Sequence, residues 1–250
     1  MIAPGEVALG KLLGAVYGVA AYVVFLASFV YAVGFVGDFL VPKTIDHGAR
    51  SDLLSALLID LALLGIFAIQ HSGMARPGFK ALWTRIIPAS LERSTYVLLS
   101  SLLLFLLFWQ WRPITVVLWD VSSGAGRATL LALFWLGWAI AVLSSFMISH
   151  LDFFGLRQVF LPLQGKLYQP PGFMIHGFYR IVRHPIMVGF ILAFWATPAM
   201  TLGHLAFAIA TTAYILVGLR LEERDLLAML GDSYHHYRRR VPMLIPWPKK

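Results

Sequence analysis

Arg183-His184-Pro185 is followed by IMVGFILAFWATPAMTLGHLAFAIATTAYILVGL at residues 186–219, and then by Arg220-Leu221-Glu222-Glu223-Arg224. The run of 34 residues contains no Lys, Arg, Asp or Glu. Because a helix rises 1.5 Å per residue, the run predicts a helical hairpin with two arms of about 25 Å each. Residues 197–198 and 201–204 are the expected break. The chain then returns to the membrane face it left, which places Arg183 and His184 near Glu222 and Glu223.

The composition is that of an integral membrane protein. Hydrophobic residues make up 59% of the 250 residues, charged residues make up 13%, and the mean hydropathy is +0.77. A soluble domain cannot bury that much apolar surface. Four further apolar segments are long enough to cross a bilayer as helices, and they cover residues 12–37, 53–70, 94–111 and 128–150. Asp60 interrupts the second segment, where an ionisable side chain is either functional or a protonated or serine-paired structural group.

The basic residues are distributed unevenly between the two sides of these segments. Of the 20 Lys and Arg residues, 16 lie on the side of the chain termini, and the other four are Lys43, Arg50, Arg112 and Arg127. By the positive-inside rule we expect both termini to be cytosolic, in a bacterial inner membrane. The net charge of +8 then indicates an anionic lipid surface as partner rather than nucleic acid. The chain has no cysteine, which excludes disulfides, cysteine-ligated zinc, iron–sulfur clusters and a thiol nucleophile.

We therefore expect an all-α integral membrane protein that forms a single domain. Four transmembrane helices lie within residues 12–150, a cytosolic segment covers 151–185, a transmembrane or re-entrant helical hairpin covers 186–221, and a cytosolic basic tail covers 222–250. The tail is expected to continue as a short helix from Glu222 to about Leu230 and to turn at Gly231-Asp232. The prolines at 242–248 argue against further helix.

Under this topology four polar clusters meet at one membrane face. They are Gln70-His71-Ser72, His150 with Asp152, Arg183-His184 and Glu222-Glu223. A single such cluster is equally well explained as an interfacial anchor, but four on one face favour a site.

The chemistry of these clusters suggests distinct roles. Asp152 would fix the tautomer of His150 and make it a general base, while Gln70 and His71 would orient or take part. Arg183 and His184, at the start of a helix, would hold a carboxylate. Adjacent glutamates on a helix point about 100° apart, so Glu222 and Glu223 should differ in role, and one of them would pair with Arg183 or Arg220.

The tail combines aromatic and basic side chains. Tyr234, Tyr237 and Arg238-Arg239-Arg240 are compatible with stacking on an adenine or with binding of lipid headgroups. Headgroup binding is the default interpretation for the arginines.

The C-terminal half resembles that of the isoprenylcysteine carboxyl methyltransferase superfamily, in Arg183-His184-Pro185, the hairpin, Glu222-Glu223, Gly231, Tyr234, Tyr237 and the terminal prolines. Upstream, the chain is similar to the methanethiol S-methyltransferases in QHSGMAR at residues 70–76, ERSTY at 92–96, HLDFFGLRQ at 150–158 and AFWATP at 193–198. It is also close to the NnrU-like membrane proteins through His71-Ser72.

The resemblance implies S-adenosylmethionine as the cofactor, because the C-terminal half binds it in that superfamily. Carried over residue by residue, it implies cofactor-binding roles for Arg183, His184, Pro185, Gly189, Glu222 and Glu223, with Tyr234 and Tyr237 in the tail that closes the site. Many members of the superfamily have a tyrosine two positions after the proline. This chain has Met187 there, so packing against the cofactor should differ at that point.

The implied reaction is S-methylation of a small thiol, methanethiol to dimethyl sulfide, by in-line transfer that needs no metal. A small alkanethiol is a weaker acid than cysteine, whose pKa is about 8.5, so a base should help. We expect that base to be His150 with Asp152, or His71 with Gln70. Candidate substrate-binding residues are Phe154, Arg157 and Trp195.

Two other classes of function share these features. A prenylcysteine carboxyl or lipid-amine methyltransferase would use the same cofactor half with a wide lateral opening for a long chain. A non-enzymatic NnrU-like haem or regulatory protein would use His71 and His150 as paired axial ligands.

Overall fold

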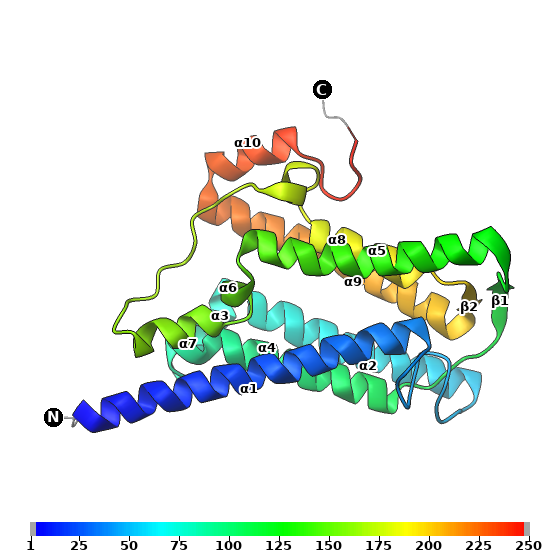
Figure 1. Cartoon of the computed structure of the whole chain (residues 1–250), viewed down its shortest axis with the longest axis horizontal. Helices are drawn as coiled ribbons and strands as arrows, with labels where there is room; N and C mark the ends of the chain where they lie inside the picture. Colours follow the sequence, from blue (N-terminus) through cyan, green and yellow to red (C-terminus); the bar gives the residue numbers. More distant parts are fainter. Residues whose placement is uncertain (1–3, 248–250) are drawn as a thin grey trace.

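Five long helices run side by side along one axis of the molecule (Figure 1). The computed structural model describes residues 4–247, so residues 1–3 and 248–250, the last of the predicted tail, lie outside the described residues. Each long helix is apolar and long enough to cross a membrane: α1 (Pro4–Gly37), α2 (Leu53–Ala75), α4 (Ala89–Gln110), α5 (Gly124–Ile148) and α9 (Leu202–Leu230). The shorter helices are α3 (Pro77–Trp83), α6 (His150–Phe153), α7 (Leu156–Leu163), η1 (Gly177–Arg180), α8 (Pro185–Trp195) and α10 (Asp232–Arg240).

The predicted hairpin is present, but its two arms are unequal. Its first arm, α8, has 11 residues and rises about 16 Å, which is too short for a bilayer, whereas α9 has 29 residues and rises about 43 Å. The break falls between Trp195 and Leu202, as expected. Equal arms were a wrong expectation, because α8 already ends at Trp195, whereas α9 runs from Leu202 through Glu222 to Leu230, where the tail helix was expected to end.

Two further elements depart from the expected architecture. Strands β1 (Val117–Asp120) and β2 (Ala199–Thr201) pair antiparallel in a small sheet that was not expected, while the described chain is otherwise mostly helical, as the predicted fold class requires. Residues 232–240 form α10, where no helix was expected, and this helix ends before Pro242. The turn predicted at Gly231 is present, with a positive φ of 55° that favours glycine.

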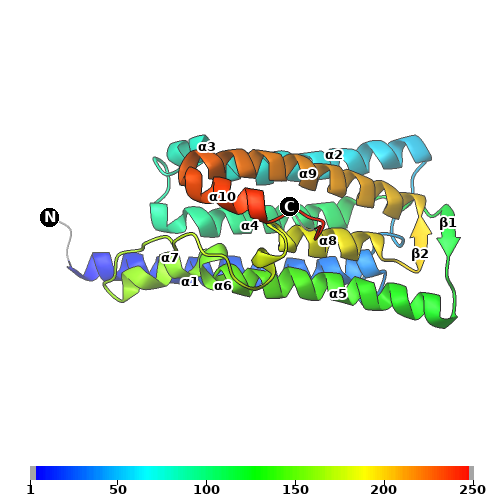
Figure 2. The same ribbon diagram turned by 90° about the horizontal axis from the view of Figure 1, so that it is seen from above.

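The two ends of the bundle differ in character. Figures 1 and 2 place α7, α10 and the start of α1 at one end, here called the polar end, and β1 and β2 at the other, the strand end. The four polar clusters predicted to converge all lie at the polar end, on the last turns of α2 and α9, in α6 and at the start of α8.

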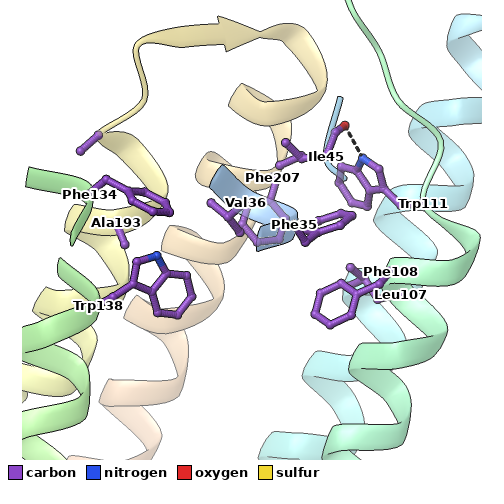
Figure 3. Close-up of a cluster of buried hydrophobic side chains, with 11 residues drawn as sticks. Phe35, Val36, Ile45, Leu107, Phe108, Trp111, Phe134, Trp138, Ala193 and Phe207 are labelled. Carbon is purple, nitrogen blue, oxygen red and sulfur yellow. Dashed lines mark hydrogen bonds between the residues drawn. The ribbon is translucent and has the colours of Figure 1, made fainter. Parts of the chain in front are cut away.

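An aromatic core fills the half of the bundle near the strand end. Figure 3 shows Phe35, Trp111, Phe134, Trp138 and Phe207 reaching toward one another from α1, α5, α9 and the segment after α4. Their edge-to-face contacts are typical of packed aromatic rings. This core holds the five long helices together, whereas the four polar clusters lie at the other end.

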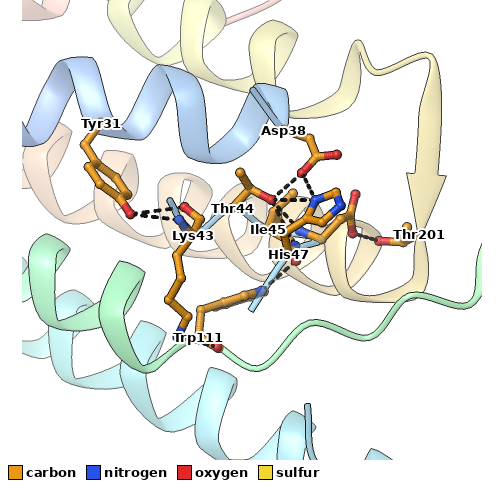
Figure 4. A network of polar contacts seen from close by, with 9 residues as sticks. Tyr31, Asp38, Lys43, Thr44, Ile45, His47, Trp111 and Thr201 are labelled. Atoms are coloured by element: carbon orange, nitrogen blue, oxygen red, sulfur yellow. Dashed lines mark hydrogen bonds and ion pairs between the residues drawn. The ribbon is translucent and has the colours of Figure 1, made fainter. Parts of the chain in front are cut away.

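A polar network fixes the loop between α1 and α2 to the strand end (Figure 4). His47 Nδ1 lies 2.7 Å from Asp38 Oδ1, and Thr201 donates to Asp46 Oδ1 at 2.6 Å. Burial raises the pKa of Asp46 to about 6. Because Thr201 also caps the start of α9 by accepting from the His204 N–H, the network ties this loop to α9.

Asp60 has a structural partner near the same end. Its Oδ1 accepts a hydrogen bond from the Arg112 N–H at 2.8 Å, just beyond the end of α4. The partner is a backbone N–H and not the expected serine, and Asp60 Oδ2 is buried without a hydrogen-bond partner among residues 4–247.

Helices α5 and α8 cross at close range, side by side in Figure 2. The crossing is made by Gly137 and Ala141 on α5 and by Gly189 and Ala193 on α8. A Cβ atom added to Gly189 would lie 2.5 Å from the Gly137 carbonyl oxygen. Small residues at four-residue spacing allow such close approach between membrane helices.

We predict that Gly189→Ala destabilises the protein by about 1–3 kcal/mol, because overpacking forces the two backbones apart. Thermal unfolding in detergent measures the effect. Gly65→Ala on α2 is the matched control, since a Cβ there has nothing within 4 Å. Equal unfolding temperatures for the two variants would contradict the close crossing.

Candidate active site

A buried ion pair closes the hairpin at the polar end. The Nε and Nη2 atoms of Arg183 each lie 2.6 Å from Glu223 Oε1, and His184 Nε2 lies 3.2 Å from the same oxygen. All three residues are buried. The expectation that Arg183 and His184 hold a carboxylate is therefore met within the chain itself, by Glu223.

The same arginine fastens the tail. Its Nη1 donates to the carbonyl oxygens of Arg238 at 3.1 Å and Val241 at 2.5 Å. The backbone N–H groups of Arg183 and His184 donate to the carbonyls of Pro242 and Met243. Four of the five guanidinium N–H groups have partners within the described chain, so Arg183 acts as a structural anchor.

Glu222 has a different environment from its neighbour, as the helix geometry predicts. Its side chain is 49% exposed, and its carboxylate lies 3.9 Å from His184 Nδ1, a long contact. Burial raises the pKa of Tyr179, and the charge of Glu222 adds to the shift. Of the two adjacent glutamates, Glu222 is the one available to a ligand.

The two tail tyrosines form a small core rather than an open stacking surface. Tyr234 and Tyr237 are buried, with ring centroids 5.8 Å apart, and Phe173 packs on both. The Tyr237 hydroxyl donates to the Tyr179 carbonyl oxygen at 2.7 Å. The Tyr234 hydroxyl is buried and has no hydrogen-bond partner among residues 4–247. Stacking of an adenine between these rings is therefore not supported.

His71, near the end of α2, lies between two hydroxyl groups of α4. The Tyr96 hydroxyl is 2.9 Å from His71 Nε2 and 3.1 Å from Nδ1, and the Ser100 hydroxyl is 3.2 Å from Nδ1. Ser100 also donates to Gln70 Oε1 at 3.2 Å. The expected pair of Gln70 and His71 is thus linked through Ser100.

Two contacts hold this end of α2 against α9. Ser72 donates to the Tyr214 hydroxyl at 3.3 Å, and Arg76 Nη1 lies 2.7 Å from Asp225 Oδ2. Tyr214 and Asp225 precede and follow Glu222 on α9. The His71 cluster therefore lies beside the stretch of α9 that carries the available glutamate.

His150, the first residue of α6, has a similar arrangement on the other side of the bundle. Its Nε2 lies 2.7 Å from the Tyr22 hydroxyl of α1, and its Nδ1 lies 2.8 Å from Ser145 Oγ of α5. The imidazole stacks on Phe146, with ring centroids 4.2 Å apart. Burial lowers the pKa of His150, which favours the neutral ring at pH 7.

Asp152 is engaged away from His150, which corrects the expected pair. Its Oδ1 accepts hydrogen bonds from Gln158 Nε2 and the Tyr168 hydroxyl, each at 2.8 Å, and Arg157 Nη1 lies 3.5 Å from Oδ2. Residues two apart on a helix point about 200° apart, so the two side chains diverge. Burial, together with the bond to Asp152, raises the pKa of Tyr168 to about 12. Asp152 thus ties α6 to α7 and to the loop that follows.

The expected substrate residues lie at different depths. Phe154 is buried at the polar end and stacks on Phe25, with centroids 4.0 Å apart. Trp195 ends α8, about 16 Å from His184 by helix rise, and donates to Thr212 of α9 at 2.9 Å. Arg157 contacts Asp152. Of the three candidates, Phe154 is the one whose ring contacts His150, with ring centroids 4.8 Å apart.

Two of the expected cofactor residues, Pro185 and Gly189, have roles in helix geometry and helix packing. Pro185 occupies the first turn of α8, where its missing N–H costs nothing, and Gly189 lies in the α5–α8 crossing. The sequence did not indicate that Tyr22, Tyr96 and Tyr214 belong to the candidate site, although Tyr96 lies in the ERSTY stretch at residues 92–96.

The chain is similar to characterised methyltransferases along nearly its whole length. A methanethiol S-methyltransferase of Mycobacterium tuberculosis is 60% identical over 235 residues, which cover 94% of this chain and 96% of that protein. The chain belongs to the methanethiol S-methyltransferase family. A methanethiol S-methyltransferase of Crocosphaera subtropica is 54% identical over 92% of this chain and 91% of its own. This confirms the resemblance to that family, and the protein is an enzyme.

More distant similarity reaches beyond this family. Nurim of Mus musculus is 30% identical over 185 residues, which cover 70% of this chain and 69% of that protein. No protein-family model matches the chain, and no solved structure is significantly similar to it.

The residues at the polar end fit a methyltransferase donor such as S-adenosylmethionine. That molecule has ribose hydroxyls and an ammonium group, which need acceptors, and a carboxylate, which needs donors. Glu222 is a half-exposed acceptor, and the buried Tyr234 hydroxyl lacks a partner within the described chain. Both lie next to the Glu223 ion pair.

The structure argues against paired axial haem ligation by His71 and His150. Both ring nitrogens of each histidine have a hydroxyl within 3.2 Å. Neither imidazole therefore offers a nitrogen to iron without loss of a hydrogen bond.

We predict that Glu223→Gln releases the tail, because a buried Arg183 without its anion costs about 3–5 kcal/mol. Hydrogen exchange measured over residues 232–245 should become faster in this variant. Glu222→Gln is the matched control and should leave the exchange of the tail unchanged. Faster exchange in both variants, or in neither, would contradict the anchoring role of Glu223.

Proposed function

We propose that the protein transfers a methyl group from S-adenosylmethionine to methanethiol, which yields dimethyl sulfide. The observation that carries the proposal is the 60% identity to a methanethiol S-methyltransferase over 94% of the chain. The arrangement at the polar end supports it, since an available glutamate and a hydrogen-bonded histidine lie on helices in contact with each other.

In this proposal Glu222 binds the donor. Its carboxylate accepts hydrogen bonds from the ribose hydroxyls or the ammonium group, while Glu223 is occupied by Arg183 and His184. The Glu223 ion pair fixes the end of α9, so Glu222 needs little reorganisation on binding. Tyr234 is the candidate donor of a hydrogen bond to the ligand carboxylate.

S-adenosylmethionine supplies an electrophilic methyl group, so the protein has to orient the two sulfur atoms and assist loss of the thiol proton. We assign the base to His71 rather than His150. His71 lies on the helix that contacts α9 near Glu222, whereas His150 packs among Tyr22, Phe146 and Phe154. In this assignment His150 and Asp152 stabilise the junction of α5, α6 and α7.

The proposed site faces the cytosol, where a charged nucleotide-like donor is dissolved. The excess of basic residues at the polar end supports this orientation and contact with anionic lipid. The small apolar thiol reaches the site from the cytosol or the bilayer. A wide opening for a prenyl chain is not needed for this acceptor.

Purified protein incubated with methyl-labelled S-adenosylmethionine and a panel of thiols, amines and carboxylates tests the reaction. Labelled dimethyl sulfide from methanethiol is the expected product by mass spectrometry. Transfer to a prenylcysteine or an amine instead would contradict the proposed acceptor.

We predict that Glu222→Gln weakens S-adenosylmethionine binding by about tenfold or more, because a charged hydrogen bond contributes about 1.5–3 kcal/mol. Calorimetric titration of the detergent-solubilised protein measures the dissociation constant. Glu92→Gln, on α4, is a surface-charge control that should bind normally. Unchanged binding in Glu222→Gln would remove Glu222 from the donor site.

A further inference from the structure

The hydrogen bonds around His71 determine which of its nitrogens is basic. A serine hydroxyl has a single hydrogen, and Ser100 gives it to Gln70 Oε1 at 3.2 Å. Toward His71 Nδ1, 3.2 Å away, Ser100 is therefore the acceptor, and Nδ1 carries the ring hydrogen. In this tautomer His71 Nε2 is unprotonated and accepts the hydrogen of the Tyr96 hydroxyl at 2.9 Å, and the same hydroxyl also lies 3.1 Å from Nδ1.

We propose that Tyr96 is a catalytic residue that relays the proton of the thiol to His71, an inference that rests on the proposed function. In this proposal the thiol contacts the Tyr96 hydroxyl, which lies 2.9 Å from His71 Nε2. Tyr96 itself is 7% exposed, so it has little contact with bulk water.

In the relay, the acceptor thiol loses its proton as its sulfur is methylated. The S–H proton moves to the Tyr96 oxygen while the hydrogen of Tyr96 moves to His71 Nε2. The thiol sulfur bonds to the methyl carbon as the sulfonium–methyl bond breaks, and that electron pair stays on the donor sulfur. The products are a neutral sulfide, a neutral Tyr96 and a His71 imidazolium, which loses its proton to water after product release.

Arg93 supports this role of Tyr96. Its guanidinium carbon lies 5.0 Å from the centroids of both the Tyr96 and Phe153 rings, and its Nε donates to the Phe153 carbonyl at 2.6 Å. A fixed positive charge against the ring stabilises the negative charge that builds on the phenol as its proton leaves.

The second histidine gives the chain an internal comparison. Ser145 donates to the Val142 carbonyl at 2.7 Å, so it too accepts from its histidine, and His150 Nε2 accepts from Tyr22. The pattern of hydrogen bonds is the same in both clusters. They differ in position, because the Tyr22 cluster lies on α1 and α5, whereas the Tyr96 cluster lies on the helices that pack toward Glu222.

The test compares Tyr96→Phe with Tyr22→Phe, each of which removes one hydroxyl that faces a histidine. Tyr96→Phe should lower kcat by about 10²–10⁴-fold, the range for loss of proton-transfer catalysis. Its KM and its calorimetric affinity for S-adenosylmethionine should stay close to wild type, and its rate should recover toward alkaline pH as thiolate forms. Tyr22→Phe should retain near-normal kcat.

Three results would overturn the relay. Normal kcat in Tyr96→Phe removes the role, and a loss confined to Tyr22→Phe moves the chemistry to His150. A nitrogen-15 spectrum that shows the His71 hydrogen on Nε2, assigned by its absence in His71→Gln, contradicts the tautomer. Wild-type protein that binds S-adenosylmethionine but makes no dimethyl sulfide refutes the proposed function instead, whatever the tautomer.

Discussion

The polar end of the molecule depends on the buried ion pair between Arg183 and Glu223. A buried charge is stable only when it is paired and hydrogen-bonded, and here the two partners lie 40 positions apart in the chain. The pair fixes the start of α8 against the end of α9, and the Nη1 hydrogen atoms of the guanidinium hold the tail. The ion pair also gives the two adjacent glutamates different environments, because Glu223 is bound to Arg183 and Glu222 is half-exposed.

The two halves of the bundle differ in their contribution: one stabilises the packing of the helices, and the other carries the polar groups of the candidate site. Near the strand end, aromatic side chains and a fixed loop hold the five long helices in register. Near the polar end, hydroxyl groups, two histidines and several charges lie between the same helices. The proposed reaction joins a charged donor to a small apolar acceptor, and we place it where α2, which carries His71, contacts α9, which carries Glu222.

Much of this arrangement follows from the sequence, and the remainder depends on tertiary geometry. The charge-free run bounded by Arg183 and Glu222 predicts a hairpin, its break and the meeting of the two ends. The helix expected from Glu222 to about Leu230 is confirmed as the end of α9, but the sequence does not predict that α8 ends after 11 residues. The pairing of Asp152 with Gln158 rather than His150 depends on side-chain direction. Contacts such as Tyr22 with His150, 128 positions apart, leave no periodic signal in the sequence.

The central claim is that the donor binds at the polar end, beside Glu222 and the Arg183–Glu223 pair. A photoreactive S-adenosylmethionine analogue, followed by peptide mass spectrometry with unlabelled donor as competitor, tests this claim most directly. The account predicts competable cross-links within residues 175–184 and 214–237. Cross-links confined to residues 38–52 or 112–123, at the strand end, would contradict it.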